Sequence, residues 1–92
     1  MDFSSHIYVQ NFLDKSAQLF PDKIALIFQK QRLSYQEINE QANTLAFELT
    51  KTGIHPGDRI LILLENSPEY VISYYGILKA DAVAVPINTD IK

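Results

Sequence analysis

Apolar residues recur every three or four positions between Tyr35 and Leu49, which is the spacing of one face of an α-helix. Polar residues fill the positions between them, so the segment is predicted to be an amphipathic helix with one buried side. Ser34 and Glu37 have the S-x-x-E spacing of a capping box, in which each side chain accepts a hydrogen bond from the other residue's backbone amide. Gly53 follows the segment and tolerates the left-handed conformation that closes many helices.

A first helix and a short hairpin are predicted ahead of this segment. The apolar positions of residues 7–20 are compatible with a helix, which ends at Pro21 because proline cannot continue it. Ile24–Phe28 is a short apolar run typical of a buried strand, and Arg32–Ser34 can return beside it as a second, very short strand. The turn between them has no Gly, Asn or Asp, the residues that best adopt the positive φ of two-residue hairpin turns. The hairpin is therefore predicted with an unfavourable turn.

The segment after the central helix begins with a tight turn and a strand. Pro56 and Gly57 suit the two central positions of a type II turn, because glycine readily adopts the positive φ of the second position. The run Ile60–Leu64 shows no alternation of polar and apolar residues. This pattern predicts a strand covered on both faces, as in a parallel sheet.

A helix over residues 67–80 and a strand over Val83–Ile87 complete the chain. Asn66 or Ser67 is the expected N-cap of the helix. Gly76 lowers helix propensity, so we expect it to allow close packing against a neighbouring element. Strand, helix and strand with connections this short predict a right-handed parallel βαβ unit. The predicted fold class is α/β, with a short β-hairpin, a parallel βαβ unit and about three helices.

Composition limits the chain to one small domain or part of one. It has 92 residues, of which 47% are hydrophobic and 21% are charged, a composition typical of globular proteins. The net charge of -3 gives no basic field for nucleic acid or anionic lipid, and without cysteine no disulfide or thiolate site can form. The N-terminus lacks the features of a signal peptide, and apolar runs such as Ile60–Leu64 are far too short to span a bilayer. We therefore expect a soluble cytoplasmic protein with no nucleic-acid partner and no membrane span.

Residues of chemical interest have ordinary structural interpretations. The three glycines are too scattered to form a phosphate-binding loop. His6 and His55 have no second ligand or base at a suitable spacing and are interpreted as exposed side chains. The carboxylates of Glu37, Glu40 and Glu48 are better explained by a helix cap and surface charges than by general acid–base catalysis.

Three of the five tyrosines lie close together in the second half of the chain. Tyr70, Tyr74 and Tyr75 lie within one predicted helix, where packing in a core or an interface is favoured over stacking on a cofactor. The residues by themselves therefore assign no catalytic, cofactor-binding or metal-binding side chain.

A known family shares the order of these features. Leu33–Ile38 reads L-S-Y-Q-E-I and resembles the L-[ST]-Y-x-E-L signature of the adenylate-forming (AMP-binding) ligases. This superfamily includes acyl-CoA synthetases, nonribosomal peptide synthetase adenylation domains and luciferases. Five further segments resemble family motifs, in the family's order and at its spacing, and with the first they cover the chain from about residue 10 onward. They are Phe20–Leu26, Asn39–Ala46, Gly53–Ile60, Asn66–Tyr70 and Gly76–Asn88.

Two positions refine this resemblance. Asp81 stands where the family usually has a glycine that closes a helix, and aspartate adopts the left-handed region less easily than glycine. The fold should survive this exchange with a small penalty. Asn88 occupies a position where peptide-synthetase domains more often carry Asp, which leans toward the acyl-CoA-ligase branch.

The resemblance implies an enzyme of which this chain is one part. Residues 1–92 correspond to the N-terminal portion of an adenylation domain, a fragment of the family's large N-terminal domain with no complete domain boundary. The implied reaction activates a small carboxylic or amino acid with ATP and Mg²⁺. The acyl group then passes to the thiol of CoA, or to the phosphopantetheine of an acyl or peptidyl carrier protein. The family's phosphate loop, ribose-binding Asp, hinge and catalytic Lys come later in its sequence.

The resemblance therefore predicts that this chain is a scaffold segment that is inactive alone. Its predicted partner is the remainder of the ligase, in the same or a second chain. The alternative is a non-enzymatic truncated or split fragment that acts as an interaction or complementing module. Either way, we expect exposed apolar surface and unpaired strand edges.

Overall fold

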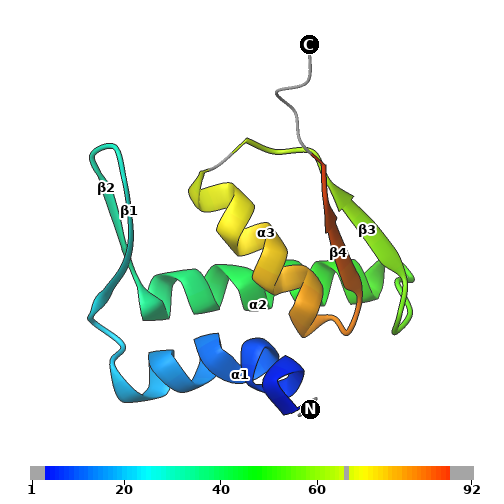
Figure 1. The fold of residues 1–92 in the computed structure, drawn as a ribbon, viewed down its shortest axis with the longest axis horizontal. Helices are drawn as coiled ribbons and strands as arrows, with labels where there is room; N and C mark the ends of the chain where they lie inside the picture. The colour runs from blue at the N-terminus through cyan, green and yellow to red at the C-terminus, as the bar shows by residue number, and fades with distance from the viewer. Residues whose placement is uncertain (1–3, 66, 88–92) are drawn as a thin grey trace.

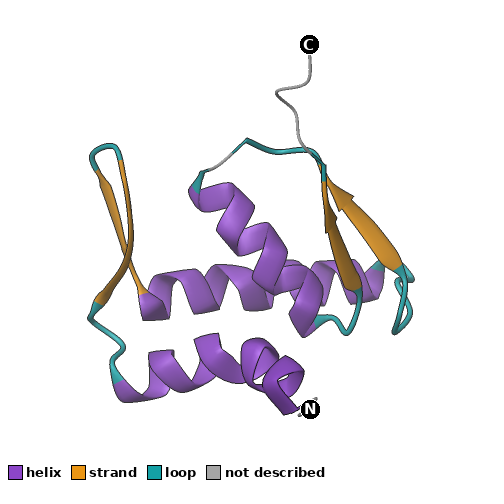
Figure 2. Ribbon diagram, in the orientation of Figure 1, coloured by secondary structure: helices purple, strands orange, loops and turns teal. Residues whose placement is uncertain are grey.

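Helix α2 (Tyr35–Lys51) crosses the molecule, and the other elements are arranged along it (Figure 1). The computed structural model describes residues 4–65 and 67–87, with side chains from residue 11 onward, so Asn66 and Asn88 lie outside the described residues. Helices α1 and α3 both contact α2, and two small sheets lie near its opposite ends (Figure 2). The remaining elements are α1 (Ser4–Leu19), β1 (Ile24–Phe28), β2 (Gln31–Ser34), β3 (Arg59–Ile62), α3 (Pro68–Lys79) and β4 (Val83–Pro86). The predicted α/β class is confirmed.

The central helix starts as its sequence predicts. The Glu37 amide donates to Ser34 Oγ at 3.1 Å, and the Ser34 amide donates to Glu37 Oε1 at 2.8 Å. These two bonds satisfy amides that would otherwise lack a partner in the first helical turn. Beyond the helix, Gly53 has φ 101°. Both ends of α2 are thus set by local sequence.

The hairpin forms despite its unfavourable turn. Strands β1 and β2 are antiparallel, and Phe28 pairs with Gln31, so Gln29 and Lys30 make the turn. Gln29 takes φ 55°, a left-handed conformation that costs a non-glycine residue about 1–2 kcal/mol. Leu26 and Leu33 compensate by packing against the first core cluster. Strand β2 begins at Gln31, one residue earlier than predicted, and α1 covers Ser4–Leu19 instead of residues 7–20.

The second sheet is the predicted parallel βαβ unit. Strands β3 and β4 pair in parallel, with Leu61 opposite Val85, and α3 connects them. The turn before β3 has Gly57 at φ 88°, and the Asp58 amide donates to the His55 carbonyl at 3.0 Å.

The ends of this unit differ slightly from the sequence prediction. Strand β3 ends at Ile62, not Leu64, and β4 ends at Pro86, not Ile87. Ser67 is the N-cap of α3, and its Oγ accepts from the Tyr70 amide at 3.2 Å. After α3, Asp81 takes φ 65°, so an aspartate adopts the left-handed conformation expected at this position.

Two small clusters form the core of the described residues. The first joins α1 to α2 and consists of Leu13, Ile38 and Ala42. The second joins β3 to α3 and the segment after it, and consists of Ile62, Ile77 and Ala82. Such a thin core leaves much apolar surface in water, as expected for a chain of this length.

Candidate functional site

One face of the β3–β4 pair is apolar and lacks a cover among the described residues. Ile60, Ile62 and Ala84 point to the side where α3 packs, because they belong to the second core cluster. Leu61, Val83 and Val85 alternate with them and therefore lie on the opposite side, which we call the outer face. Leu61 is 60% exposed and Val83 is 45% exposed. The prediction that both faces of this strand are covered is thus wrong for the chain as described.

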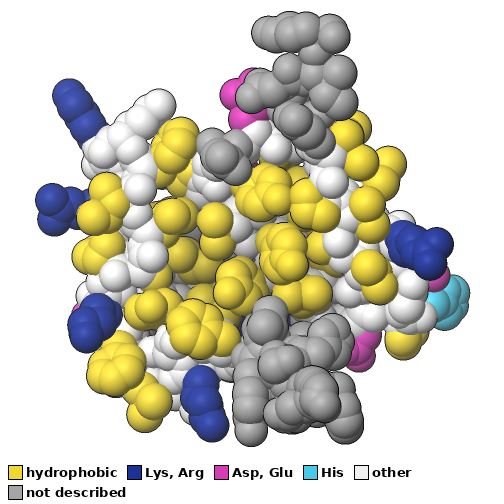
Figure 3. Space-filling model, viewed as in Figure 1, with side chains coloured by type: hydrophobic (Ala, Val, Ile, Leu, Met, Phe, Trp, Pro, Cys, Tyr) yellow, Lys and Arg dark blue, Asp and Glu magenta, His cyan; other side chains and the backbone are white. Residues whose placement is uncertain are grey.

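This arrangement is unusual for a parallel sheet. Parallel strands are normally covered on both faces, and sheets of two strands are seldom stable alone. Among the described residues, β3 and β4 each pair with one strand, so each has an edge without a strand beside it. The expectation of exposed apolar surface is confirmed. Figure 3 shows further hydrophobic side chains over α3, at the centre of the view. Exposed apolar patches are typical of interaction sites, ligand-binding grooves and aggregation-prone surfaces.

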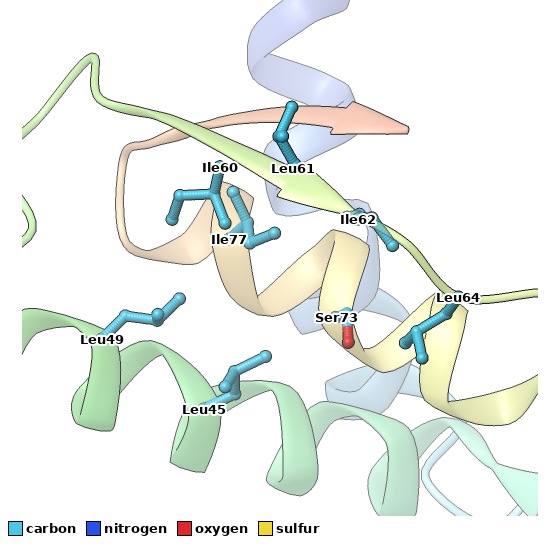
Figure 4. Close-up of a pocket in the computed structure, with 8 residues that line it drawn as sticks. All are labelled: Leu45, Leu49, Ile60, Leu61, Ile62, Leu64, Ser73 and Ile77. Carbon is cyan, nitrogen blue, oxygen red and sulfur yellow. The ribbon is translucent and has the colours of Figure 1, made fainter. Parts of the chain in front are cut away.

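An apolar groove adjoins the β3–β4 pair. It has a volume of about 190 Å³ and lies between α2, α3 and β3. Figure 4 shows Leu45 and Leu49 of α2 directed toward the strand, with Ile60 and Ile77 above them. Its lining consists of Leu45, Leu49, Ile60, Leu61, Ile62, Leu64, Ser73 and Ile77. A lining without charged groups suits an apolar side chain and gives nothing to hold a phosphate.

One ion pair ties the first helix to the third. Lys79 Nζ lies 2.8 Å from Asp14 Oδ1, and the Lys79 side chain is 9% exposed while that of Asp14 is 53% exposed. The hydrogen bond from Lys79 lowers the pKa of Asp14 below its ordinary value of 3.8, with smaller contributions from the charge of Lys79 and from Asn39. Partial burial opposes this shift of the pKa. The pair links α1 to α3 by a contact between residues distant in sequence.

Replacing Asp14 with asparagine should lower the free energy of unfolding by about 0.5–1 kcal/mol, because the exposed carboxylate is screened by water. A carboxylate whose pKa is lowered in the folded state stabilises the fold at pH values above its ordinary pKa. This stabilisation is lost as the pH falls through the pKa of the folded state. The difference between the Asp14→Asn variant and the parent chain should therefore persist at neutral pH and shrink below pH 3.8. Urea denaturation at several pH values measures it. A difference that does not change with pH would contradict this origin.

The polar residues singled out in the sequence lie apart from one another. Glu37 caps α2, and Glu40 accepts a hydrogen bond from Gln36 Nε2 at 3.2 Å. The His55 side chain is 82% exposed, and its Nδ1 lies 4.0 Å from Asp58 Oδ2. Glu48 is exposed on α2, and the side chain of His6 is outside the described residues.

The tyrosines of α3 pack as predicted. Tyr75 lies against the first core cluster, and Tyr70 and Tyr74 lie against the second. The rings of Tyr74 and Tyr75 meet edge to face with their centroids 6.1 Å apart. Burial raises the pKa of the Tyr75 hydroxyl above its ordinary value of 10.0, with smaller contributions from Tyr74 and Tyr35.

The described residues show no cluster of metal-ligating side chains and no glycine loop. No three His, Cys, Asp or Glu side chains in this part of the chain converge as metal ligands would. Gly53 and Gly57 lie in separate turns, and a Cβ added at either would meet no protein atom within 4 Å. None of the helices in residues 4–65 and 67–87 has the length and apolar character required to cross a bilayer.

Known proteins match most of this chain. A family model described as AMP-binding enzyme matches residues 13–92. Tyrocidine synthase 1 of Brevibacillus parabrevis is 37% identical over 82 residues, which are 89% of this chain and 8% of that protein. A long-chain-fatty-acid–CoA ligase of Bacillus subtilis is 41% identical over 80 residues, or 87% of this chain and 14% of the ligase.

A solved structure agrees with these relatives. The N-terminal subdomain of Klebsiella oxytoca NpsA, in complex with 3-hydroxyanthranilyl-AMSN, superposes with a TM-score of 0.86 and 37% sequence identity. The match covers 91% of this chain and 22% of the solved one. The chain therefore spans less than a quarter of each of these three relatives.

The sequence carried no separate signal for the outer face of β3–β4. A strand that is buried on both sides and a strand that is exposed on one side can have the same apolar run.

Proposed function

This chain belongs to the AMP-binding enzyme family, and on that premise we propose that it is the N-terminal scaffold segment of an ATP-dependent, carboxylate-activating ligase. In the proposed reaction, a carboxylate oxygen of a small carboxylic or amino acid attacks the α-phosphorus of ATP, and pyrophosphate leaves. A thiol of CoA or of carrier-bound phosphopantetheine then displaces AMP from the acyl-adenylate. Positioning and neutralisation of phosphate charge accelerate such steps.

The proposal depends chiefly on how small a part of its relatives the chain matches. Residues 13–92 match the family model, yet the chain spans 14% of the CoA ligase and 22% of the solved subdomain. We infer that residues 1–92 form the opening portion of an adenylation domain and do not contain its boundary. The bare outer face supports this inference, because a segment of a larger sheet would leave such a face when seen alone.

The described residues contribute structure and no chemical step. No cluster of metal-ligating side chains occurs among them, and we assign the binding of ATP and Mg²⁺ to parts of the ligase outside this chain. The capping box of α2, the turn at Gly57 and the buried Gly76 hold three helices and two strand pairs in place. We therefore propose no activity for residues 1–92 alone.

A second candidate is a non-enzymatic module that complements or binds another chain. The apolar outer face favours it, because such surface is the usual basis of association between proteins. The two candidates differ in whether the segment is part of an active ligase. In the first, the remainder of the ligase, in the same or a second chain, completes the enzyme, and in the second the segment acts as a non-enzymatic module.

Exchange of pyrophosphate into ATP tests the first candidate. The native polypeptide that carries this N-terminus should exchange labelled pyrophosphate in the presence of one class of acid from a panel. Residues 1–92 alone, used as the control, should show no exchange above background. Exchange by the 92-residue chain would contradict the scaffold role. A native polypeptide that is no longer than this chain would favour the second candidate.

A further inference from the structure

We propose that the end of the molecule formed by the second half of α1 and the β1–β2 hairpin is a docking surface for a separate, acidic protein. The docking segment of that protein presents carboxylates around apolar side chains. We call this end the basic surface, and it consists of Lys15, Leu19, Phe20, Lys23, Lys30 and Arg32. The inference goes beyond the proposed function, because this surface can bind a partner whether or not the polypeptide is a ligase.

Positive charge is concentrated at this end of an acidic chain. Residues 15–34 contain the four cations of the basic surface and one carboxylate, that of Asp22, so this stretch has a net charge of +3. The whole chain has a net charge of -3, so its other residues sum to -6. The Lys and Arg side chains visible in Figure 3 gather mostly on the left, where Figure 1 shows the hairpin and the end of α1. The chain therefore has a local basic field that its net charge conceals.

The four cations are not neutralised within the part of the chain that the structure describes. All four residues are exposed, and none of them forms an ion pair with a described carboxylate. The ion pairs among the described residues lie elsewhere, at Lys79 and at His55. Burying cations inside a domain is costly unless each one is paired. We therefore expect the basic surface to remain at the periphery of a longer polypeptide, where a separate protein can reach it.

Apolar side chains lie between these cations. Leu19 is 65% exposed and Phe20 is 50% exposed, at the end of α1 and just after it. Lys15 and Leu19 are four residues apart on α1, so they share one face of the helix. Lys23 Nζ lies 4.9 Å from the centroid of the Phe20 ring. An apolar centre with a charged rim is typical of surfaces that bind other proteins.

An acidic protein segment fits the basic surface better than an anionic bilayer or a nucleic acid does. Bilayers and nucleic acids extend beyond one end of a small molecule, so they would also meet the net charge of -6 on the remaining residues. A protein segment can match the basic surface alone. Its Asp and Glu carboxylates would form charge-assisted hydrogen bonds with the cations, and its apolar side chains would cover Leu19 and Phe20.

Photo-crosslinking in the cells that make the native polypeptide tests this inference. Photoreactive benzoylphenylalanine replaces Leu19 in one variant and Phe47 in the control. The two positions are matched, because both lie on helices and are 65% and 62% exposed. Phe47 also has a cation over its ring, with Lys51 Nζ 5.3 Å from the centroid, but it lies outside the basic surface. Mass spectrometry identifies the molecule and the peptide attached at each position.

Charge reversal then tests the chemistry of the attachment. The peptide attached at position 19 is synthesised, and its affinity for the purified native polypeptide is measured by fluorescence anisotropy. Lys23→Glu combined with Arg32→Glu should weaken binding about tenfold or more, because repulsion replaces two attractive pairs. Lys51→Glu, the control, should change the affinity by less than about twofold. Lys15→Glu combined with Lys30→Glu serves as a second pair if the first variant fails to fold.

One set of results supports the proposal. Position 19 attaches to a peptide of another protein that has a net negative charge and apolar residues, and position 47 does not. The charge reversals weaken binding of that peptide as expected. Attachment to phospholipid, to nucleic acid or to the same polypeptide overturns the proposed partner. Equal attachment at the two positions, no attachment at position 19, or an affinity that charge reversal leaves unchanged overturns the docking surface.

Discussion

Truncation of Leu13 to alanine is expected to lower the free energy of unfolding of the chain by about 3 kcal/mol. Leu13 is 2% exposed and packs with Ile38 and Ala42, so it anchors α1 to α2. Its loss removes buried methyl groups and leaves a cavity that two rigid helices can only partly close. Urea denaturation followed by the helical circular dichroism signal measures the change.

The same helix provides the control. Leu19 lies on α1 as well but is 65% exposed, so Leu19→Ala should change the free energy of unfolding by no more than about 0.5 kcal/mol. The two variants lose the same atoms and have similar effects on helix propensity. Equal losses for both would contradict the position of α1 against α2.

Replacement of Gly76 with alanine should destabilise the chain by about 2 kcal/mol, although alanine favours helix by about 1 kcal/mol over glycine. A Cβ at this position would lie 2.7 Å from Leu45 Cδ2 and 3.0 Å from Leu45 Cγ and Cβ. These atoms belong to one side chain of α2, so either Leu45 must change its conformation or the two helices must move apart by a few tenths of an ångström. The prediction from the sequence that Gly76 permits close packing is confirmed by these distances.

A double-mutant cycle identifies the cause of this loss. In a Leu45→Ala background the Cγ and Cδ2 contacts disappear, and Gly76→Ala should then cost less than about 1 kcal/mol. Ser73→Ala on the same helix controls for helix propensity and should be neutral or slightly stabilising. The measurement is the urea midpoint of each variant. A cost for Gly76→Ala that is unchanged by Leu45→Ala would show that the close approach of the helices is not responsible.

Local chemistry made several elements predictable. The bonds between Ser34 and Glu37 span three residues, so they can be read from spacing alone. The positive φ values of Gly53 and Gly57 follow from the residue type in the same way. The hairpin turn was harder to predict, because Gln29 adopts φ 55° only while Leu26 and Leu33 pack against helices distant in sequence.

The sequence by itself determined the order of helices and strands, their caps, the parallel βαβ unit and the family to which the chain belongs. These features depend on periodicity and on contacts between residues close along the chain. Only the tertiary structure decided that α3 covers one side of β3–β4 and that Leu61 and Val83 on the other side remain exposed. It also decided that Lys79 of α3 meets Asp14 of α1 across 65 residues. The physical reason is that an apolar run specifies burial of a strand without specifying which element supplies the cover.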